Sequence, residues 1–299
     1  MIAPRTLPAN SFRSFYQISA RSQILSLGQH TKIMGIVNVT PDSFSQDGCW
    51  NLKKRSPDSA IRYAQTLIRD GADVIDVGGE SSRPGAKPIT VEEELKRVIP
   101  VIKKLSQKNT HIPISIDTYK PQVAQAALDA GAVIVNNIFG TQLNTALLKM
   151  IARYDAAIVL MHMQGTPRNM QQRIHYRDLM TDIIDALHKS MEKCLEIGIK
   201  SDRIIIDPGI GFGKTVEHNL EIINCLHKLK QLHRPILVGT SRKSFIGKIL
   251  DKDTSHRLGG TAASVSASIL RGAPIVRVHD VKAMKDVVLL TDAILRQKA

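Results

Sequence analysis

The chain has 299 residues, a length that fits one large domain or two small ones and is ample for a buried core. Its 41 lysine and arginine residues against 27 aspartate and glutamate residues give a net charge of +14, and a content of 43% hydrophobic and 23% charged residues excludes a disordered, collagen-like or low-complexity protein. No run approaches the roughly 18 consecutive apolar residues of a membrane span, and three widely spaced cysteines (Cys49, Cys194 and Cys225) indicate neither a disulfide framework nor a cysteine zinc site, which fits a reducing compartment.

The basic excess does not indicate a nucleic-acid partner, because the lysines and arginines are spread along the chain and only 4% of the residues are aromatic. The first thirty residues contain no acidic residue and three arginines, which is the composition of an organellar transit peptide. Pro4 and Pro8 interrupt any amphipathic helix there. We therefore expect residues 1–22 to be an irregular extension and residues 23–299 to form one domain.

Eight short apolar runs rich in β-branched residues follow one another, each separated from the next by a stretch with helical periodicity. They are residues 33–39, 73–77, 112–116, 133–135, 157–161, 203–206, 235–238 and 274–278. Helix boundaries are signalled by Ser56-Pro57, by Thr90 with Glu93, and by the glycines at 71, 131, 198 and 272. Eight strands alternating with eight helices predict an α/β fold of the (β/α)8 (TIM) barrel type, whereas a doubly wound sheet usually has fewer strands.

Polar residues end nearly every predicted strand, at the barrel face where catalytic groups gather. They are Asn38, Asp76, Glu80, Asp117, Asn136, Asn137, His162, Asp207, Ser241, Arg242, Lys243, Arg277, His279 and Asp280. Each one alone also fits the N-cap of the following helix. Asp117, Asn136 and Asp207 suit a flat heterocycle that presents N–H donors, whereas Arg83, Lys243, Arg277 and His279, with Asn38, suit an anion such as a phosphate. The sequence therefore predicts a pocket with two chemically different halves.

Two familiar binding motifs are absent. The segment 209–215 resembles a phosphate-binding P-loop but is one residue short, so we interpret it as a flexible βα loop with Phe212 exposed to the mouth. His162 and His279 are far from any cluster of zinc ligands. A hard cation fits better, because the Asn38 carbonyl oxygen could hold Mg²⁺ bridged to a phosphate-bearing ligand.

Six segments together resemble the dihydropteroate synthase family. They are MGIVNVTPDSFS at 34–45, GGESSRPG at 78–85, SIDT at 115–118, DPGIGFGK at 207–214, GTSRKS at 239–244 and RVHD at 277–280. The resemblance runs from about residue 23 to the C-terminus. It implies a (β/α)8 barrel that condenses 6-hydroxymethyl-7,8-dihydropterin diphosphate with p-aminobenzoate, giving 7,8-dihydropteroate and pyrophosphate with Mg²⁺, and that is a sulfonamide target.

The resemblance also implies roles for individual residues. Asp117, Asn136, Asp207 and Lys243 would bind the pterin; Asn38, Arg277 and His279 the diphosphate, with Asn38 also holding Mg²⁺; and Ser82, Arg83, Pro84, Phe212, Lys243 and Ser244 the p-aminobenzoate. Lys243, Asp117 and Asp207 would be the catalytic residues, with Lys243 acting by position and charge rather than as a Schiff-base nucleophile. The family usually forms homodimers, and the sequence shows no fused pyrophosphokinase domain, so we expect a cytoplasmic homodimer of bacterial, stand-alone type. We expect it to act on these small molecules, with neither a nucleic-acid nor a membrane partner.

The sequence departs from the family pattern at three places. Ser82 replaces a usual threonine and keeps the hydroxyl, Asn137 replaces a usual aspartate, and residues 45–49 alter the first loop. The replacement at 137 keeps open a barrel that binds pterin without turnover. A methyl-transferring pterin-binding barrel is a further alternative, although it gives no reason for the segments 241–244 and 277–279. A basic nucleic-acid-binding barrel is the alternative from another functional class.

Overall fold

The computed structural model describes residues 14–40, 57–82, 85–108, 111–166, 168–172 and 174–297. Several sequence predictions fall outside these residues and stay predictions. They are the conformation of residues 1–13, the helix start at Ser56, the altered loop at 45–49, and the assignments of Arg83 and Pro84.

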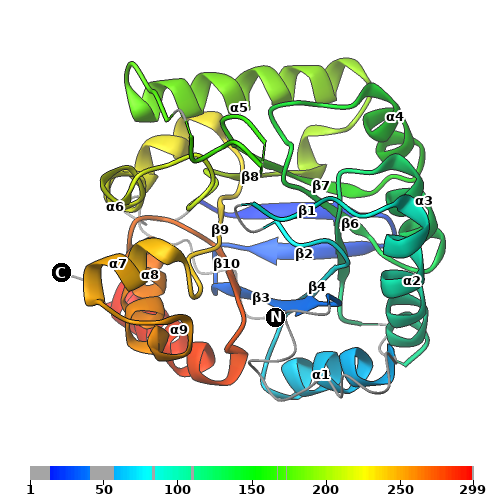
Figure 1. Ribbon diagram of the computed structural model, residues 1–299, viewed down its shortest axis with the longest axis horizontal. Coiled ribbons are helices and arrows are strands. Elements are labelled where there is room, and N and C mark those ends of the chain that lie inside the picture. Colours follow the sequence, from blue (N-terminus) through cyan, green and yellow to red (C-terminus); the bar gives the residue numbers. More distant parts are fainter. Residues whose placement is uncertain are drawn as a thin grey trace, which may run out of the picture.

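Eight parallel strands form the centre of the fold, in the order β8-β7-β6-β5-β4-β3-β10-β9 (Figure 1). Their bounds are β3 Lys32–Asn38, β4 Val74–Gly78, β5 Ile114–Asp117, β6 Ile134–Asn137, β7 Ala157–Met161, β8 Ile204–Asp207, β9 Leu237–Val238 and β10 Ile275–Val278. A parallel bridge between Ile206 and Ile236 joins the two outer strands, and the Ile206 N–H donates to the Pro235 carbonyl oxygen at 3.0 Å. The sheet closes in this way, and the predicted (β/α)8 barrel is confirmed.

Helices surround the strands and bury one face of each against them (Figure 1). The α-helices are α1 Pro57–Arg69, α2 Val91–Lys108, α3 Pro121–Asp129, α4 Thr145–Arg153, α5 Leu179–Glu196, α6 Val216–Asn224, α7 Ser244–Leu250, α8 Leu258–Leu270 and α9 Val281–Arg296; short 3₁₀ turns are η2 Ser201–Arg203, η3 Leu226–Leu232 and η4 Thr254–His256. We expected eight helices, and the described part of the chain contains nine α-helices. The extra helix arises because both α7 and α8 follow β9. The predicted stop glycines at 71, 131, 198 and 272 all adopt positive φ angles at helix ends.

A β-hairpin precedes the barrel and closes its bottom. β1 Tyr16–Ala20 pairs antiparallel with β2 Gln23–Leu27, so the expectation of an irregular segment is wrong for residues 16–20. Ile18 and Leu27 are almost fully buried and pack with Met34, Val74 and other residues near the amino ends of the barrel strands. Because the hairpin fills this end, the opposite end, where the strands finish, is the one available for a site.

Candidate active site

Three of the predicted site residues, Asn38, Asp117 and Asn136, lie at the carboxyl ends of neighbouring strands. Asn38 of β3 pairs in register with Gly78 of β4, Gly78 with Asp117 of β5, and Asp117 with Asn136 of β6. A Cβ atom on Gly78 would lie 3.6 Å from Asn38 Oδ1 and 3.8 Å from Asp117 Oδ2. Glycine therefore leaves room between an amide oxygen and a carboxylate, and the two groups flank one small space.

Arg277 lies at the centre of a charged cluster at this end of the barrel. Its Nε donates to Asp76 Oδ2 at 2.6 Å and its Nη2 donates to Asp117 Oδ2 at 2.8 Å. Asn136 Nδ2 donates to the same Asp76 oxygen at 3.0 Å. The Asp76 side chain is fully buried, whereas those of Arg277 and Asp117 keep 19% and 14% of their surface exposed. In this structure, therefore, carboxylates engage the arginine that was assigned to the diphosphate.

The ionisable groups of the site titrate near neutral pH. Burial raises the pKa of Asp117 to about 7, although Arg277 opposes the shift. Burial likewise raises the pKa of Asp207 to about 6, against the hydrogen bond from the Gly209 N–H. For Lys243, burial and the charge of Arg277 lower the pKa to about 8, with Asp207 and Asp117 acting in the opposite direction. Such perturbed groups, gathered at one end of a barrel, are typical of a functional site.

The loop after β8 is tied down by a buried lysine that sequence reasoning did not single out. Lys214 Nζ contacts His162 Nδ1 at 3.0 Å and donates to the Phe212 and His162 carbonyl oxygens at 3.0 and 3.3 Å. Burial lowers the pKa of Lys214 to about 7; burial and Lys214 together lower that of His162 to about 2, so this histidine is neutral. Because the ammonium is used within the protein, the near-match to a P-loop is not a phosphate cradle, and the contacts of Lys214 connect the loop to the end of β7.

Phe212 is 8% exposed, so the prediction that it is exposed to the mouth is wrong. It packs with Ile138 and with methionines at 161, 163 and 170. One ring face meets Lys243, whose Nζ lies 4.0 Å from the ring centroid. A Cβ on Gly211 would lie 3.1 Å from Lys243 Cδ, so the glycine lets the lysine stem cross the loop toward Asp207 and Asp117.

The turn after β9 is joined to the end of β10. Ser241 Oγ lies 3.1 Å from His279 Nδ1, and the His279 N–H donates to Ser241 Oγ at 3.2 Å. Arg242 has a positive φ of 58° and forms hydrogen bonds of 3.0 and 2.6 Å with the two carboxylate oxygens of Asp280. Arg242 therefore stabilises this turn. Lys243 lies just before α7, and Ser244 is the first residue of that helix.

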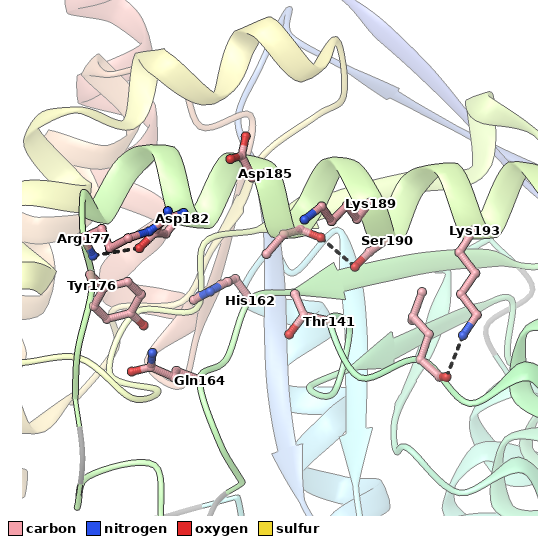
Figure 2. A pocket seen from close by; sticks show the side chains of 12 residues that line it. Thr141, His162, Gln164, Tyr176, Arg177, Asp182, Asp185, Lys189, Ser190 and Lys193 are labelled. Carbon is pink, nitrogen blue, oxygen red and sulfur yellow. Dashed lines mark hydrogen bonds and ion pairs between the residues drawn. The ribbon is translucent and has the colours of Figure 1, made fainter.

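Asn137 and His162 have structural contacts away from the charged cluster. Asn137 is buried, and its Oδ1 accepts from the Phe139 N–H at 3.0 Å, which fixes the turn after β6. His162 lines a separate cavity of about 510 Å³ beneath α5, together with Tyr176, Lys189 and others (Figure 2). The structure thus places His162 on the side of β7 that faces α5.

A metal cluster and a membrane span are both absent from the described parts of the chain. There, no three histidine, cysteine or acidic side chains are grouped so that they could hold a metal ion. Among the same residues, none of the helices has the length and apolar character needed to cross a membrane.

Comparisons with known proteins agree with this geometry. The family model described as "Pterin binding enzyme" matches residues 34–279. A dihydropteroate synthase of Synechocystis is 46% identical over 270 residues, covering 90% of this chain and 92% of that protein. A Yersinia pestis dihydropteroate synthase solved in a sulfonamide drug complex superposes with a TM-score of 0.87 at 40% identity, covering 93% and 98% of the two chains. The Clostridium difficile dihydropteroate synthase solved in the presence of pteroic acid superposes with a TM-score of 0.82 at 46% identity, covering 91% of this chain and 99% of that chain. The chain therefore belongs to the pterin-binding enzyme family, among the dihydropteroate synthases.

Proposed function

We propose that this chain condenses 6-hydroxymethyl-7,8-dihydropterin diphosphate with p-aminobenzoate, as the family does. The reaction breaks the bond between the exocyclic methylene carbon and a diphosphate oxygen, and the diphosphate leaves with the electron pair. The arylamine nitrogen forms the new C–N bond and releases one proton. The observation that carries the proposal is the cluster of Asp76, Asp117, Asn136 and Arg277 at the strand ends, with Asp207 and Lys243 beside it.

The hydrogen-bond acceptors of the site bind the pterin. Asp117 and Asp207 present carboxylate oxygens and Asn136 presents an amide, which suits a ring carrying amino and ring N–H donors. Positive charge develops on the pterin as the diphosphate leaves, and ionised carboxylates stabilise it. With pKa values of about 7 and about 6, Asp117 and Asp207 ionise near neutral pH and respond to that charge.

Asn38, Arg277 and His279 bind the diphosphate leaving group. Asn38 Oδ1, a hard oxygen ligand beside Gly78, would hold Mg²⁺, with the Asp117 carboxylate on the other side of the glycine. When bound, Mg²⁺ would neutralise charge on the departing diphosphate. The Arg277 guanidinium and the His279 ring would contact the same anion, Arg277 by exchanging part of its bonding from Asp117 to the diphosphate.

The residues that bind the arylamine, p-aminobenzoate, are Ser82, Arg83, Pro84, Phe212, Lys243 and Ser244. Lys243 contacts the Phe212 ring and precedes Ser244 at the start of α7, so one short segment offers both an ammonium and a hydroxyl to the p-aminobenzoate carboxylate. Its ammonium also interacts with the Asp207 and Asp117 carboxylates, which favour the charged form of Lys243. These contacts support a positioning and electrostatic role.

The expected assembly is a cytoplasmic homodimer. Exposed large apolar side chains concentrate on the three C-terminal helices; they are Ile249 and Leu250 of α7, Leu258 and Leu270 of α8, and Leu289, Leu290 and Ile294 of α9. Because α8 packs against both α7 and α9, this concentration of exposed apolar side chains supports a protein–protein interface there. Sedimentation of the purified chain would measure its mass, and a monomer at micromolar concentration would contradict the assignment.

The decisive experiment measures pyrophosphate and dihydropteroate formation from the pterin diphosphate, with and without p-aminobenzoate and Mg²⁺. Formation of both products that depends on Mg²⁺ and is lost in Asp117→Ala and Lys243→Ala supports the proposal. Pterin binding without dihydropteroate would instead indicate a binding protein, and borohydride trapping of substrate on Lys243 would refute its assigned role.

A further inference from the structure

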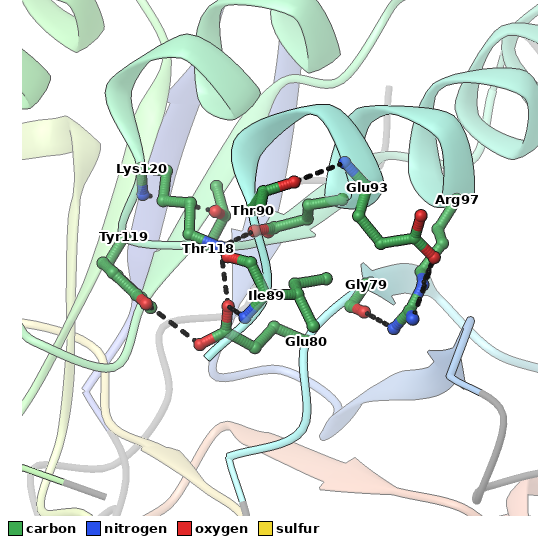
Figure 3. Close-up of polar contacts among 10 residues, drawn as sticks. Gly79, Glu80, Ile89, Thr90, Glu93, Arg97, Thr118, Tyr119 and Lys120 are labelled. Carbon is green, nitrogen blue, oxygen red and sulfur yellow. Dashed lines mark hydrogen bonds and ion pairs between the residues drawn. The ribbon is translucent and has the colours of Figure 1, made fainter. Parts of the chain in front are cut away.

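A lysine outside the predicted site joins both ends of the loop between β4 and α2. Lys120 precedes α3 and lies three residues after Asp117. Its Nζ donates to Glu80 Oε2 at 2.6 Å, to Glu94 Oε2 at 2.6 Å and to the Ile89 carbonyl oxygen at 2.8 Å (Figure 3). Glu80 follows the end of β4, Ile89 comes just before α2, and Glu94 lies in its first turn, so one ammonium links the start and the end of the loop.

The Glu80 carboxylate also links the start of this loop to its end. Its Oε2 also accepts from the Ile89 N–H at 3.2 Å, and its Oε1 accepts from the Tyr119 hydroxyl at 2.9 Å (Figure 3). Both polar backbone groups of Ile89 are therefore held by side chains, Glu80 and Lys120. Ser82, assigned to the p-aminobenzoate side, is only two residues from Glu80.

The network is largely removed from water. The exposed side-chain fractions are 15% for Glu80, 11% for Lys120 and 1% for Glu94. Burial lowers the pKa of Lys120, but the bonds to Glu80 and Glu94 outweigh this effect and raise it above its ordinary value, so the lysine stays charged. Glu94 Oε1 is buried without a partner in the described part of the molecule, which leaves Lys120 as the neutralising contact of this carboxylate.

We propose that Lys120 is a positioning residue for the arylamine substrate, acting through Glu80 and Ile89 on the loop that presents Ser82. The inference rests on the proposed function. The pterin side has its own hydrogen bonds, since those among Arg277, Asp117, Asp76 and Asn136 do not involve Lys120. Loss of Lys120 therefore impairs p-aminobenzoate binding and spares pterin binding.

The test replaces Lys120 with methionine, which keeps the stem length and removes the ammonium. We expect KM for p-aminobenzoate to rise about tenfold or more, because small displacements of positioning groups are costly. The Kd of the pterin diphosphate, measured by calorimetry, stays within about twofold and kcat within about threefold. Lys32→Met is the matched control, since Lys32 pairs with Asp73 at 2.9 Å at the opposite end of β3, and it should leave all three values unchanged.

A second readout does not depend on turnover. In Lys120→Met, amide hydrogen exchange should quicken in peptides covering residues 79–90 and stay unchanged in those covering β6. Glu80→Gln keeps a side-chain oxygen that can accept hydrogen bonds and removes the negative charge, so it should raise the KM for p-aminobenzoate less than Lys120→Met does. Glu80→Gln serves as the test variant if Lys120→Met does not fold. An equal weakening of both substrates, or unchanged exchange at residues 79–90, would overturn the inference. Absence of dihydropteroate from the natural chain would refute the proposed function, and the exchange result would still decide the role of Lys120.

Discussion

Replacing Asp117 with asparagine should stabilise the protein while it abolishes activity. Burial raises the pKa of the Asp117 carboxyl from its ordinary value of 3.8 to about 7. At about 1.4 kcal/mol per pH unit, this difference makes the ionised form cost about 4 kcal/mol of folding free energy. Asparagine has no charge and keeps an oxygen that accepts from Arg277, so we expect a gain of about 2–4 kcal/mol at pH 8.

The pH dependence identifies the cause of this gain. Between pH 3.8 and about 7 the native carboxyl holds a proton that the unfolded chain has lost, so the stability of the natural chain falls as pH rises through this window. The asparagine variant lacks this contribution. The difference in stability between the two chains should therefore be small near pH 4, grow through pH 5 and 6, and reach its full size above about pH 7.

Urea denaturation of both chains from pH 5 to 8 measures this difference, and the product assay measures the activity. We expect turnover to fall by about 100-fold or more, because a charge that stabilises the transition state is lost. Asp73→Asn is the control: Asp73 accepts from Lys32 Nζ and from the Ile33 N–H, each at 2.9 Å, so this variant should lose about 1 kcal/mol. An Asp117→Asn chain that is less stable than the natural one at pH 8, or whose advantage does not change with pH, would refute the reasoning.

Three further predictions test other parts of the fold. Gly209→Ala should cost about 2 kcal/mol or more in thermal unfolding, because φ is +71° and a Cβ would overlap the His162 carbonyl oxygen; an unchanged Tm would contradict it. Ile18→Ala should cost about 2–5 kcal/mol in urea denaturation if the hairpin is part of the core, and a loss well below 1 kcal/mol would mean that it is not. Asn137→Asp keeps the oxygen that accepts from the Phe139 N–H, so kcat/KM should stay within about threefold, and a larger gain would show that the natural asparagine limits activity.

The barrel, and the grouping of polar residues at the ends of its strands, were predictable because both are encoded locally. The strands are short apolar runs with a polar residue at the end or shortly after it, and the fold itself brings those ends together, so Asn38, Asp117 and Asn136 lie on neighbouring strands. Helix stops such as Gly131 were equally readable, since a positive φ favours glycine.

The remaining features depend on contacts between distant parts of the chain. Lys214 meets His162 across 52 positions and Lys120 meets Glu80 across 40, and no local pattern reports such pairs. Phe212 was expected at the surface because it lies in a glycine-rich loop, but methionines from two other segments cover it. The hairpin left only a weak signal, because apolar and polar residues alternate in β2 from Leu25 to Leu27 alone, and the exposed residue before them, Ile24, is apolar.

The site combines charges that folding alone does not favour. Burial opposes the ionised forms of Asp117 and Asp207 and the protonated form of Lys243, and each pKa is displaced toward neutrality. Asp76 Oδ1 and Ser115 Oγ, also near the carboxyl ends of the strands, are buried without a hydrogen-bond partner among the described residues. A ligand that donates N–H groups to the carboxylates and presents an anion to the cations would relieve these costs together. Under the proposed function, the groups whose burial costs stability are therefore the ones that select a substrate with a donor-rich ring at one end and a diphosphate at the other.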